Sequence, residues 1–244
     1  MINLISSTGE LLPQRPHSVK RRLEIFTHSD YRPLVIRGLI FDLDGTLVDS
    51  LPGIASALNC SLQDLNLPTH SVEAVESFIG DGILTLVQRA LGNEDPDQCN
   101  QVLTHFQEHY SKNWQGGTHP YSGMMALLEQ FHKKGLPMAV LSNKPHSFTV
   151  EIVQTLFPSH LFDPIQGHRE EFPKKPDPTT ALQIVSDWGL TPKEVAYVGD
   201  STVDLATANA GQLIPLIFSW GYGTPKNFPL LNSVEELAAA VSKS

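Results

Sequence analysis

Short apolar runs alternate with segments of helical periodicity along most of this chain. Runs that are apolar at nearly every position cover residues 39–41, 138–141, 195–198 and 213–218, and a weaker run covers residues 162–166. Strands that are apolar on both faces and alternate with helices are typical of a parallel sheet that is covered on both sides. The pattern therefore predicts an α/β fold, a Rossmann-like parallel sheet with helices on both faces.

The expected helices fall into two groups. Helical periodicity at residues 122–134, 146–156, 179–188, 205–210 and 234–241 accompanies the strands of the sheet. Residues 53–118 are helical throughout, with segments at 54–65, 72–91 and 96–114, and Gly80-Asp81-Gly82 interrupts the second segment. Because no convincing strand occurs there, a compact all-helical insert is expected directly after the first strand and its loop.

The remaining part of the chain is residues 1–37, an N-terminal extension that precedes the first strong strand. Its basic cluster, Lys20-Arg21-Arg22, is interpreted as a solvated face rather than an interaction arm. Short added strands or helix, partial disorder and a role in dimer formation are all compatible with this segment. The chain is expected to be a monomer or a homodimer.

Composition and charge narrow the class of protein. The 244 residues carry a net charge of −9, which argues against a broad nucleic-acid surface. The two cysteines, Cys60 and Cys99, lie far apart, and no apolar run approaches the roughly 18 residues of a membrane helix. A charged-then-apolar signal pattern is missing at the N-terminus, so we expect a reduced, cytoplasmic protein with neither a membrane nor a nucleic-acid partner.

Candidate chemistry begins where the first apolar run ends, at Asp42-Leu43-Asp44-Gly45-Thr46. An extended backbone would place Asp42 and Asp44 on one face, and Gly45 permits a sharp turn after them. Two neighbouring carboxylates at the end of an apolar strand repel each other, which is unfavourable for stability but suits a cation site or acid–base chemistry. A turn with two solvated acids is the simpler alternative.

Two further strand ends carry polar clusters, at residues 142–144 and 200–204. Ligands bind at the carboxyl ends of parallel strands, where these clusters would meet. Asp42, Asp200 and a backbone carbonyl of the first loop offer hard oxygen ligands for Mg²⁺ bound together with a phosphate. Ser142, the backbone N–H beside Asn143, and Lys174 or Lys175 would bind the phosphate oxygens. One loop aspartate would attack phosphorus and the other would transfer protons; these residue patterns leave open which does which.

Four ordered motifs resemble those of the haloacid dehalogenase-like hydrolases, over residues 38–224. They are Asp42-Leu43-Asp44-Gly45-Thr46, Ser142-Asn143, Lys175-Pro176 and Gly199-Asp200-Ser201-Thr202-Val203-Asp204. The resemblance implies that Asp42 is a nucleophile forming an aspartyl-phosphate and that Asp44 is the general acid–base.

The same resemblance implies further roles. Ser142, Asn143 and Lys175 would hold the phosphate. Asp42, the Asp44 carbonyl and Asp200 would bind Mg²⁺, and Asp204 and Thr46 would support the site.

The helical insert resembles the C1-type cap of this family. The implied organisation is a catalytic core of residues 38–52 and 119–244 and a cap of residues 53–118, with hinges near residues 51–53 and 121–123. Gly80, Gly82 and Arg89 resemble the phosphoglycolate phosphatase branch and are candidate specificity residues. The simpler alternatives are a helix break needed for packing and an ordinary surface arginine. His105 and His109, four residues apart beside Glu108, are interpreted as a partly exposed helix face.

These features favour a Mg²⁺-dependent phosphatase for a small phosphorylated metabolite, with 2-phosphoglycolate preferred. Pyrophosphatase, sugar-phosphate phosphatase and β-phosphoglucomutase-like isomerase activities are alternatives on the same fold. A metal-independent dehalogenase and a non-catalytic phosphate-binding module are less favoured, because the acid, lysine and metal-ligand set is complete.

Overall fold

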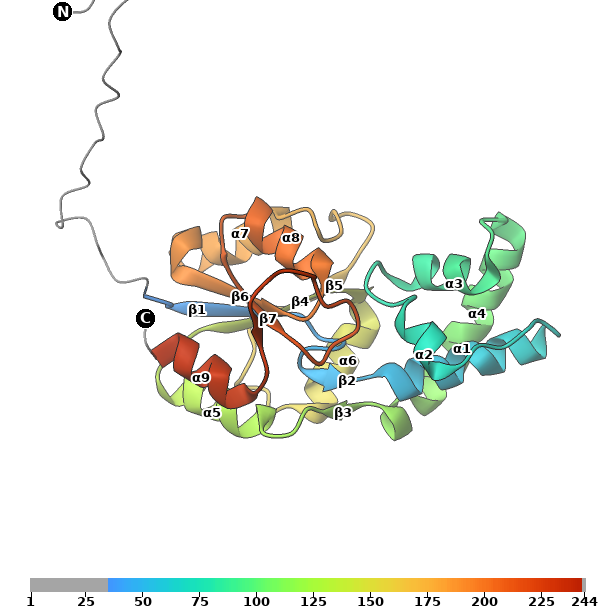
Figure 1. Ribbon diagram of the computed structural model, residues 1–244, viewed down its shortest axis with the longest axis horizontal. Coiled ribbons are helices and arrows are strands. Elements are labelled where there is room, and N and C mark those ends of the chain that lie inside the picture. Colours follow the sequence, from blue (N-terminus) through green and yellow to red (C-terminus); the bar gives the residue numbers. More distant parts are fainter. Residues whose placement is uncertain (1–34, 243–244) are drawn as a thin grey trace, which may run out of the picture. The chain divides into compact units, whose positions relative to one another are not determined.

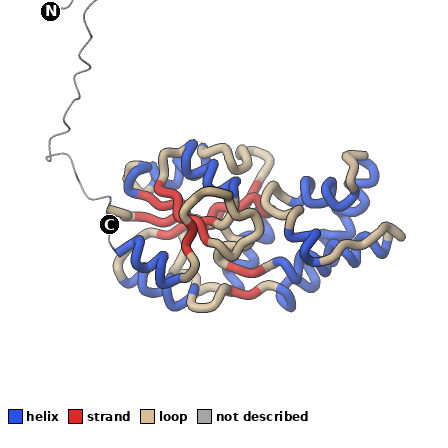
Figure 2. The backbone as a smooth tube through the Cα atoms, viewed as in Figure 1, coloured by secondary structure: helices blue, strands red, loops and turns tan. Residues whose placement is uncertain are grey.

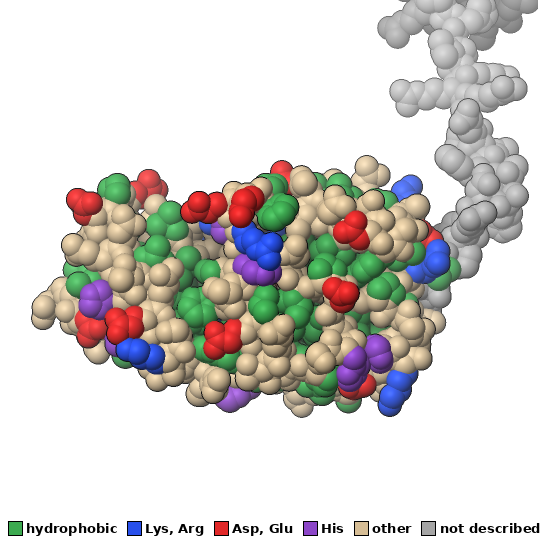
Figure 3. All heavy atoms as spheres, turned by 180° about the vertical axis from the view of Figure 1, so that it is seen from behind, with side chains coloured by type: hydrophobic (Ala, Val, Ile, Leu, Met, Phe, Trp, Pro, Cys, Tyr) green, Lys and Arg blue, Asp and Glu red, His purple; other side chains and the backbone are tan. Residues whose placement is uncertain are grey.

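The structure is a computed structural model that describes residues 35–242. The predicted N-terminal extension, apart from its last three residues, and its basic cluster at residues 20–22 lie outside the described residues. Within residues 35–242, no helix is long and apolar enough to cross a membrane. On the face of the molecule in Figure 3, lysine and arginine side chains are few and separated from one another.

A six-stranded parallel sheet forms the centre of the fold, with strand order β5-β4-β1-β6-β7-β8 (Figures 1 and 2). Its strands are β1 (Gly38–Phe41), β4 (Met138–Pro145), β5 (Ile165–His168), β6 (Val195–Gly199), β7 (Ile214–Phe218) and β8 (Leu230–Leu231). Leu39 of β1 pairs with Met138 on one side and with Ala196 on the other. This central position places the carboxyl ends of β4 and β6 beside the loop that follows β1.

Helices cover both faces of the sheet, as predicted. These helices are α5 (Met124–Lys133), α6 (His146–Leu156), α7 (Thr179–Asp187), α8 (Thr202–Ala210) and α9 (Val234–Ser242). Figure 1 shows α7 and α8 on one side and α5 and α9 on the other. The alternation of β1 divides the core accordingly: Ile40 packs in the cluster that includes Ile184 of α7, whereas Leu39 and Phe41 belong to the cluster that includes Leu128 of α5.

The predicted helical insertion is also confirmed. It contains α1 (Leu51–Asp64), α2 (Val72–Glu76), α3 (Ile83–Leu91), α4 (Pro96–Asn113) and the 3₁₀ turn η1 (Trp114–Gly117). The expected segment 72–91 is two helices, since Gly80 and Gly82 between them have φ values of +122° and +93°. Only glycine adopts such angles without strain, so these two glycines account for the break between the helices.

Several short elements were not predicted from the hydrophobic pattern. An antiparallel pair, β2 (Val48–Asp49) and β3 (His119–Pro120), joins the two chain segments that enter and leave the insertion (Figure 1). The 3₁₀ turn η2 (Pro192–Glu194) carries a capping box between Thr191 and Glu194. A two-residue strand is too short to show an alternating period, so the hydrophobic pattern does not predict β2, β3 and β8.

Two boundaries differ in ways that matter for the site. Strand β4 continues to Pro145, so Ser142, Asn143 and Lys144 lie inside the strand rather than after it. Helix α8 begins at Thr202, three residues earlier than expected, because Ser201 and Asp204 form a reciprocal capping box. Asp204 therefore lies in the first turn of this helix, close to Asp200.

Candidate active site

Three aspartates meet at the carboxyl ends of β1 and β6. Asp42 follows β1, Asp200 follows β6, and Asp204 lies in the first turn of α8. All three are buried, and one carboxylate oxygen from each lies within 4.8 Å of the others. Buried carboxylate oxygens this close together form a hard-ligand set of the kind that holds Mg²⁺, so the residues present fit this ion.

Lys175 provides the positive charge among these acids. Its Nζ lies 3.0 Å from Asp42 Oδ1 and 2.7 Å from Asp204 Oδ1. Burial alone lowers the pKa of this lysine, but the Asp204 and Asp42 carboxylates outweigh burial and raise the pKa well above its usual range. Of the two lysines of this loop, it is Lys175 whose ammonium group contacts the aspartates.

Backbone and side-chain donors fix the orientation of the acids. Asp200 Oδ1 accepts a hydrogen bond from Thr46 Oγ1 at 2.6 Å, and its Oδ2 accepts from the Tyr222 backbone N–H at 2.7 Å. Asp204 Oδ2 accepts from the Ser201 hydroxyl at 2.6 Å in the α8 capping box. Asp200 is thus held by groups from distant parts of the chain, whereas Asp204 is held within the cap of its own helix. The hydrogen bond from Thr46 couples the first loop to Asp200.

Burial makes the charges of this cluster costly. It raises the pKa of Asp42 to about 6 even though Lys175 opposes the shift, and it raises the pKa of Asp200 well above its usual range with Asp204 and Asp42 adding to the effect. A divalent cation among these carboxylates would favour their ionised forms. The raised pKa values of Asp42 and Asp200 thus agree with the oxygen ligands in indicating a cation site.

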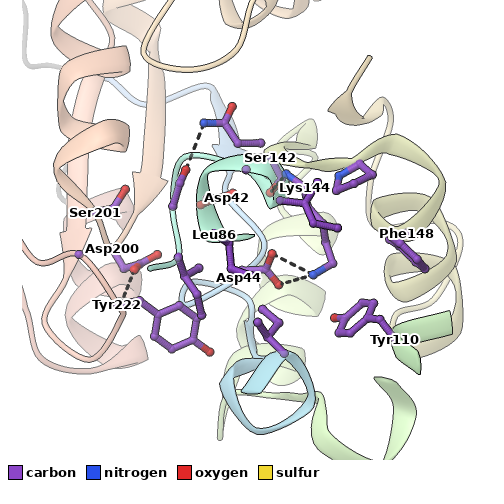
Figure 4. Close-up of a pocket in the computed structure, with 18 of the residues that line it drawn as sticks. Asp42, Asp44, Leu86, Tyr110, Ser142, Lys144, Phe148, Asp200, Ser201 and Tyr222 are labelled. Carbon is purple, nitrogen blue, oxygen red and sulfur yellow. Dashed lines mark hydrogen bonds and ion pairs between the residues drawn. The ribbon is translucent and has the colours of Figure 1, made fainter. Parts of the chain in front are cut away.

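Asp44 has a different set of partners. Its carboxylate lies 3.1 and 3.2 Å from Lys144 Nζ and accepts a hydrogen bond from Ser50 Oγ at 2.6 Å. Figure 4 shows the Asp44 carboxylate and the Lys144 ammonium pointing toward each other, near Tyr110. The ammonium lies 4.5 Å from the centre of the Tyr110 ring. Asp42 and Asp44 of the first loop therefore face different lysines, Lys175 and Lys144.

Lys144 and Tyr222 are site residues that the sequence interpretation missed. Lys144 directly follows Ser142-Asn143, so its place in a polar cluster at a strand end was the available signal. The Tyr222 hydroxyl accepts from the Ser50 and Leu51 backbone N–H groups at 2.8 and 3.0 Å and donates to Asp49 Oδ1 at 2.9 Å. Nothing local in the sequence indicates that contact, because about 170 residues separate its partners.

Ser142 and Asn143 lie beside the aspartates, in β4. Ser142 lines the cavity, and its Oγ accepts from the Lys144 backbone N–H at 3.3 Å. Asn143 Oδ1 accepts from the Lys175 backbone N–H at 2.9 Å, and its Nδ2 donates to the Lys175 and Gly80 carbonyls, both at 3.1 Å. The Asn143 side chain therefore holds the lysine loop and touches the insertion.

The cavity lies between the sheet and the helical insertion (Figure 4). Its polar side includes Asp42, Asp44, Ser142, Lys144 and Asp200. The insertion contributes Gly80, Gly82 and a largely apolar surface that includes Ile79, Ile83, Leu86 and Phe106. An apolar cover over charged groups excludes water and strengthens electrostatic interactions inside the site.

Arg89 is placed differently from the two glycines. It is not among the described residues that line the cavity. Its Nη1 donates to the Phe78 carbonyl at 3.0 Å, and its Nη2 pairs with Asp81. Arg89 thus ties together the loop that carries Gly80 and Gly82.

Comparisons with known proteins agree with this geometry. The family model for haloacid dehalogenase-like hydrolases matches residues 39–213. A phosphoglycolate phosphatase of Yersinia pestis is 36% identical over 194 residues, covering 77% of this chain and 84% of the relative. A phosphoglycolate phosphatase of Thiobacillus denitrificans is 30% identical over 223 residues, covering 87% and 98%. The crystal structure of a predicted phosphoglycolate phosphatase from Haemophilus somnus superimposes with a TM-score of 0.78 at 28% identity, covering 84% of this chain and 97% of that one.

Proposed function

The chain belongs to the haloacid dehalogenase-like hydrolases, and from that membership we propose that it is a Mg²⁺-dependent phosphatase for a small phosphorylated metabolite. The observation that carries the proposal is the buried cluster of Asp42, Asp200 and Asp204 around Lys175. A phosphoryl group brings the negative charge that this lysine and a divalent cation would share.

In the proposed reaction, an Asp42 carboxylate oxygen attacks phosphorus while the bond from phosphorus to the leaving oxygen breaks. Asp44 gives its proton to that oxygen. In the second step water attacks the aspartyl-phosphate, its proton passes to Asp44, and the bond between Asp42 and phosphorus breaks. Lys175 and Ser142 bind the phosphoryl oxygens throughout, and Asn143 fixes the lysine loop.

Asp42, Asp200 and the Asp44 backbone carbonyl would hold Mg²⁺, with Asp204 supporting them. When bound, this ion neutralises charge on the phosphoryl oxygens and the attacking carboxylate. The distinct surroundings of Asp42 and Asp44 support their different roles, since Lys175 faces the first and Lys144 and Ser50 the second.

We further propose that residues 53–118 act as a cap over a core of residues 38–52 and 119–244. The contact between Asn143 Nδ2 and the Gly80 carbonyl supports this role, because it places the loop between α2 and α3 against the phosphate-binding strand. Opening would occur near residues 51–53 and 121–123 to admit substrate and release product.

For the substrate we propose 2-phosphoglycolate, in keeping with the named activity of the relatives above. Sugar phosphates are an alternative, because the apolar residues Ile79, Ile83 and Leu86 share the cavity with Tyr110, Lys144 and Tyr222. Pyrophosphate remains an alternative, because it needs no contact with the cover.

The decisive experiment measures phosphate release from 2-phosphoglycolate, pyrophosphate, sugar phosphates and an aryl phosphate, each with Mg²⁺ and with EDTA. We expect Mg²⁺-dependent release with a clear preference for 2-phosphoglycolate. Release spread over the panel would support the reaction but contradict the substrate. A requirement for a bisphosphate activator with little free phosphate would indicate a mutase. In a separate assay, EDTA-insensitive chloride release from a 2-chloro acid would indicate a dehalogenase. Tight metal binding without any turnover would overturn the phosphatase proposal.

A further inference from the structure

A second group of potential metal ligands lies on the helical insertion. Asp64 is the last residue of α1, and His105 and His109 lie one turn apart on α4. None of the three lines the cavity of the candidate active site. Figure 3 shows histidine and acidic side chains gathered at the end of the molecule that carries these helices.

The three side chains converge on one point. His109 Nε2 lies 2.7 Å from Asp64 Oδ2, and His105 Nδ1 lies 3.2 Å from the same oxygen. One ligand atom from each residue lies within 4.8 Å of the others. Ligands about 2.0–2.2 Å from a single Zn²⁺ lie at comparable distances from one another.

Helix geometry makes this arrangement persistent. Residues four apart lie on one face of a helix, which is why paired histidines at this spacing are effective metal ligands. Val102 and Phe106 of α4 pack in the same buried cluster as Leu58 and Leu62 of α1, so the two helices are fixed against each other. The carboxylate thus comes from a rigid neighbour rather than from a loop.

The cluster is accessible to an ion from solvent and offers both nitrogen and oxygen ligands. The side chains of Asp64, His105 and His109 are 46%, 36% and 29% exposed, so an ion enters without unfolding the insertion. The imidazole nitrogens and the carboxylate oxygen form a mixed ligand set, unlike the all-carboxylate cluster of the sheet.

We propose that Asp64, His105 and His109 bind one transition-metal cation, with Zn²⁺ as the favoured ion and Ni²⁺ and Cu²⁺ as chemical equivalents. Three protein ligands leave at least one coordination position for water. The bound ion links the end of α1 to α4 and stabilises the insertion. The site is independent of the phosphatase chemistry proposed for the sheet.

The first test is calorimetric titration of the full chain with ZnCl₂ in the presence of excess Mg²⁺, which would compete with Zn²⁺ for the carboxylate cluster. We expect one Zn²⁺ per chain and a rise in melting temperature. Loss of an outer contact to a metal ligand already weakens metal binding by about 10–100-fold, so His105→Ala and His109→Ala should each weaken it by more than about 100-fold.

The matched control is the double variant His132→Ala/His160→Ala. These two histidine rings also lie close together, 4.6 Å apart, and His160 pairs with Glu129, but they do not belong to a three-ligand cluster. We expect this variant to bind Zn²⁺ like the parent chain. Unchanged circular dichroism spectra would verify that all variants fold.

A spectroscopic readout identifies the ligands themselves. With one equivalent of Cu²⁺ and excess Mg²⁺, we expect electron paramagnetic resonance to show hyperfine splitting from two nitrogens, and from one nitrogen in His105→Ala. Absence of a Zn²⁺ equivalent in the parent chain would overturn the proposal. So would loss of Zn²⁺ binding in His132→Ala/His160→Ala with retention in His109→Ala, or a Cu²⁺ spectrum without nitrogen splitting.

Discussion

Two groups of three potential metal ligands in this molecule are built in opposite ways. Asp42, Asp200 and Asp204 are 8%, 2% and 0% exposed and are all acidic. In the group on the helical insertion, the Asp64 side chain is 46% exposed, and its two neighbours are histidines that hydrogen-bond to it. The three carboxylates of the first group repel one another, whereas the histidines of the second group hydrogen-bond to its carboxylate.

The two groups differ in whether a bound cation is needed to explain their electrostatic cost. Buried like charges are unfavourable unless a counter-charge accompanies them, and Lys175 alone offsets three carboxylates only in part. The buried group therefore implies a function that outweighs its cost to stability. The exposed group is stable by itself in water, so only a binding experiment shows whether an ion occupies it.

The most severe way to test the buried group is Asp42→Asn. We expect phosphate release to fall at least about 10⁴-fold, since this change removes the proposed nucleophile while keeping its size. Burial raises the pKa of Asp42 to about 6, so its negative charge disfavours the folded state above that pH. Without Mg²⁺ at about pH 8, urea unfolding should show the variant at least as stable as the parent chain. Retained turnover would contradict the role of Asp42.

The next test removes the buried counter-charge by Lys175→Met. Because uncompensated carboxylates remain buried, we expect the free energy of unfolding to fall by about 3–5 kcal/mol near pH 8 in EDTA. The loss should shrink as the pH falls toward about 6, because without Lys175 the pKa of Asp42 rises further and this residue takes up a proton at a higher pH than in the parent chain. Urea titrations at several pH values provide the measurement.

Lys174→Met is the matched control for that experiment. Lys174 is only partly buried and precedes Lys175 in the same loop. We expect its removal to change the free energy of unfolding by no more than about 0.5 kcal/mol. Equal losses in the two variants would mean that the loop as a whole, rather than the charge among the aspartates, is responsible.

The fold was predictable because its signals are local. Runs that are apolar on both faces predicted the parallel sheet, and the periodicity of residues 53–118 predicted the helical insertion. The pairing of Val48 with Pro120 escaped prediction, because two-residue strands show no period and their partners lie far apart in the chain. The extension of β4 through Lys144 escaped for a related reason, since polar residues end the apolar run but not the strand.

The candidate site was predictable only in part. Asp42, Ser142 and Asp200 follow from the rule that ligands bind at the carboxyl ends of parallel strands. The pairing of Lys144 with Asp44 and the contact of Tyr222 with the start of α1 depend on tertiary folding. Sequence patterns show which residue types gather at a strand end, but they do not show which acid each lysine faces.

A smaller effect is expected where the helical insertion meets the sheet, in the matched variants Gly82→Ala and Gly80→Ala. Both residues have positive φ, so each alanine should cost about 1–3 kcal/mol of backbone strain. At Gly82 the added methyl group would also lie 3.1 Å from Lys174 Nζ and 3.3 Å from the Asn143 carbonyl, whereas at Gly80 it would meet open space. We therefore expect Gly82→Ala to raise KM for the substrate more than Gly80→Ala, as steady-state kinetics would show. Identical kinetics would mean that the cap does not close against Asn143 during turnover.

The smallest effect is expected for a partly exposed ion pair of the helical insertion, Arg89 and Asp81. Their side chains are 38% and 37% exposed, so Arg89→Ala should lower the free energy of unfolding by only about 0.2–1 kcal/mol. Because Arg89 holds the loop of Gly80 and Gly82 rather than facing the cavity, we expect Arg89→Ala and Asp81→Asn to raise KM by similar, small factors. A far larger rise in Arg89→Ala alone would show that this arginine contacts the substrate directly. In that case the exposed Arg89 of the insertion and the buried charged residues at the end of the sheet would belong to one site.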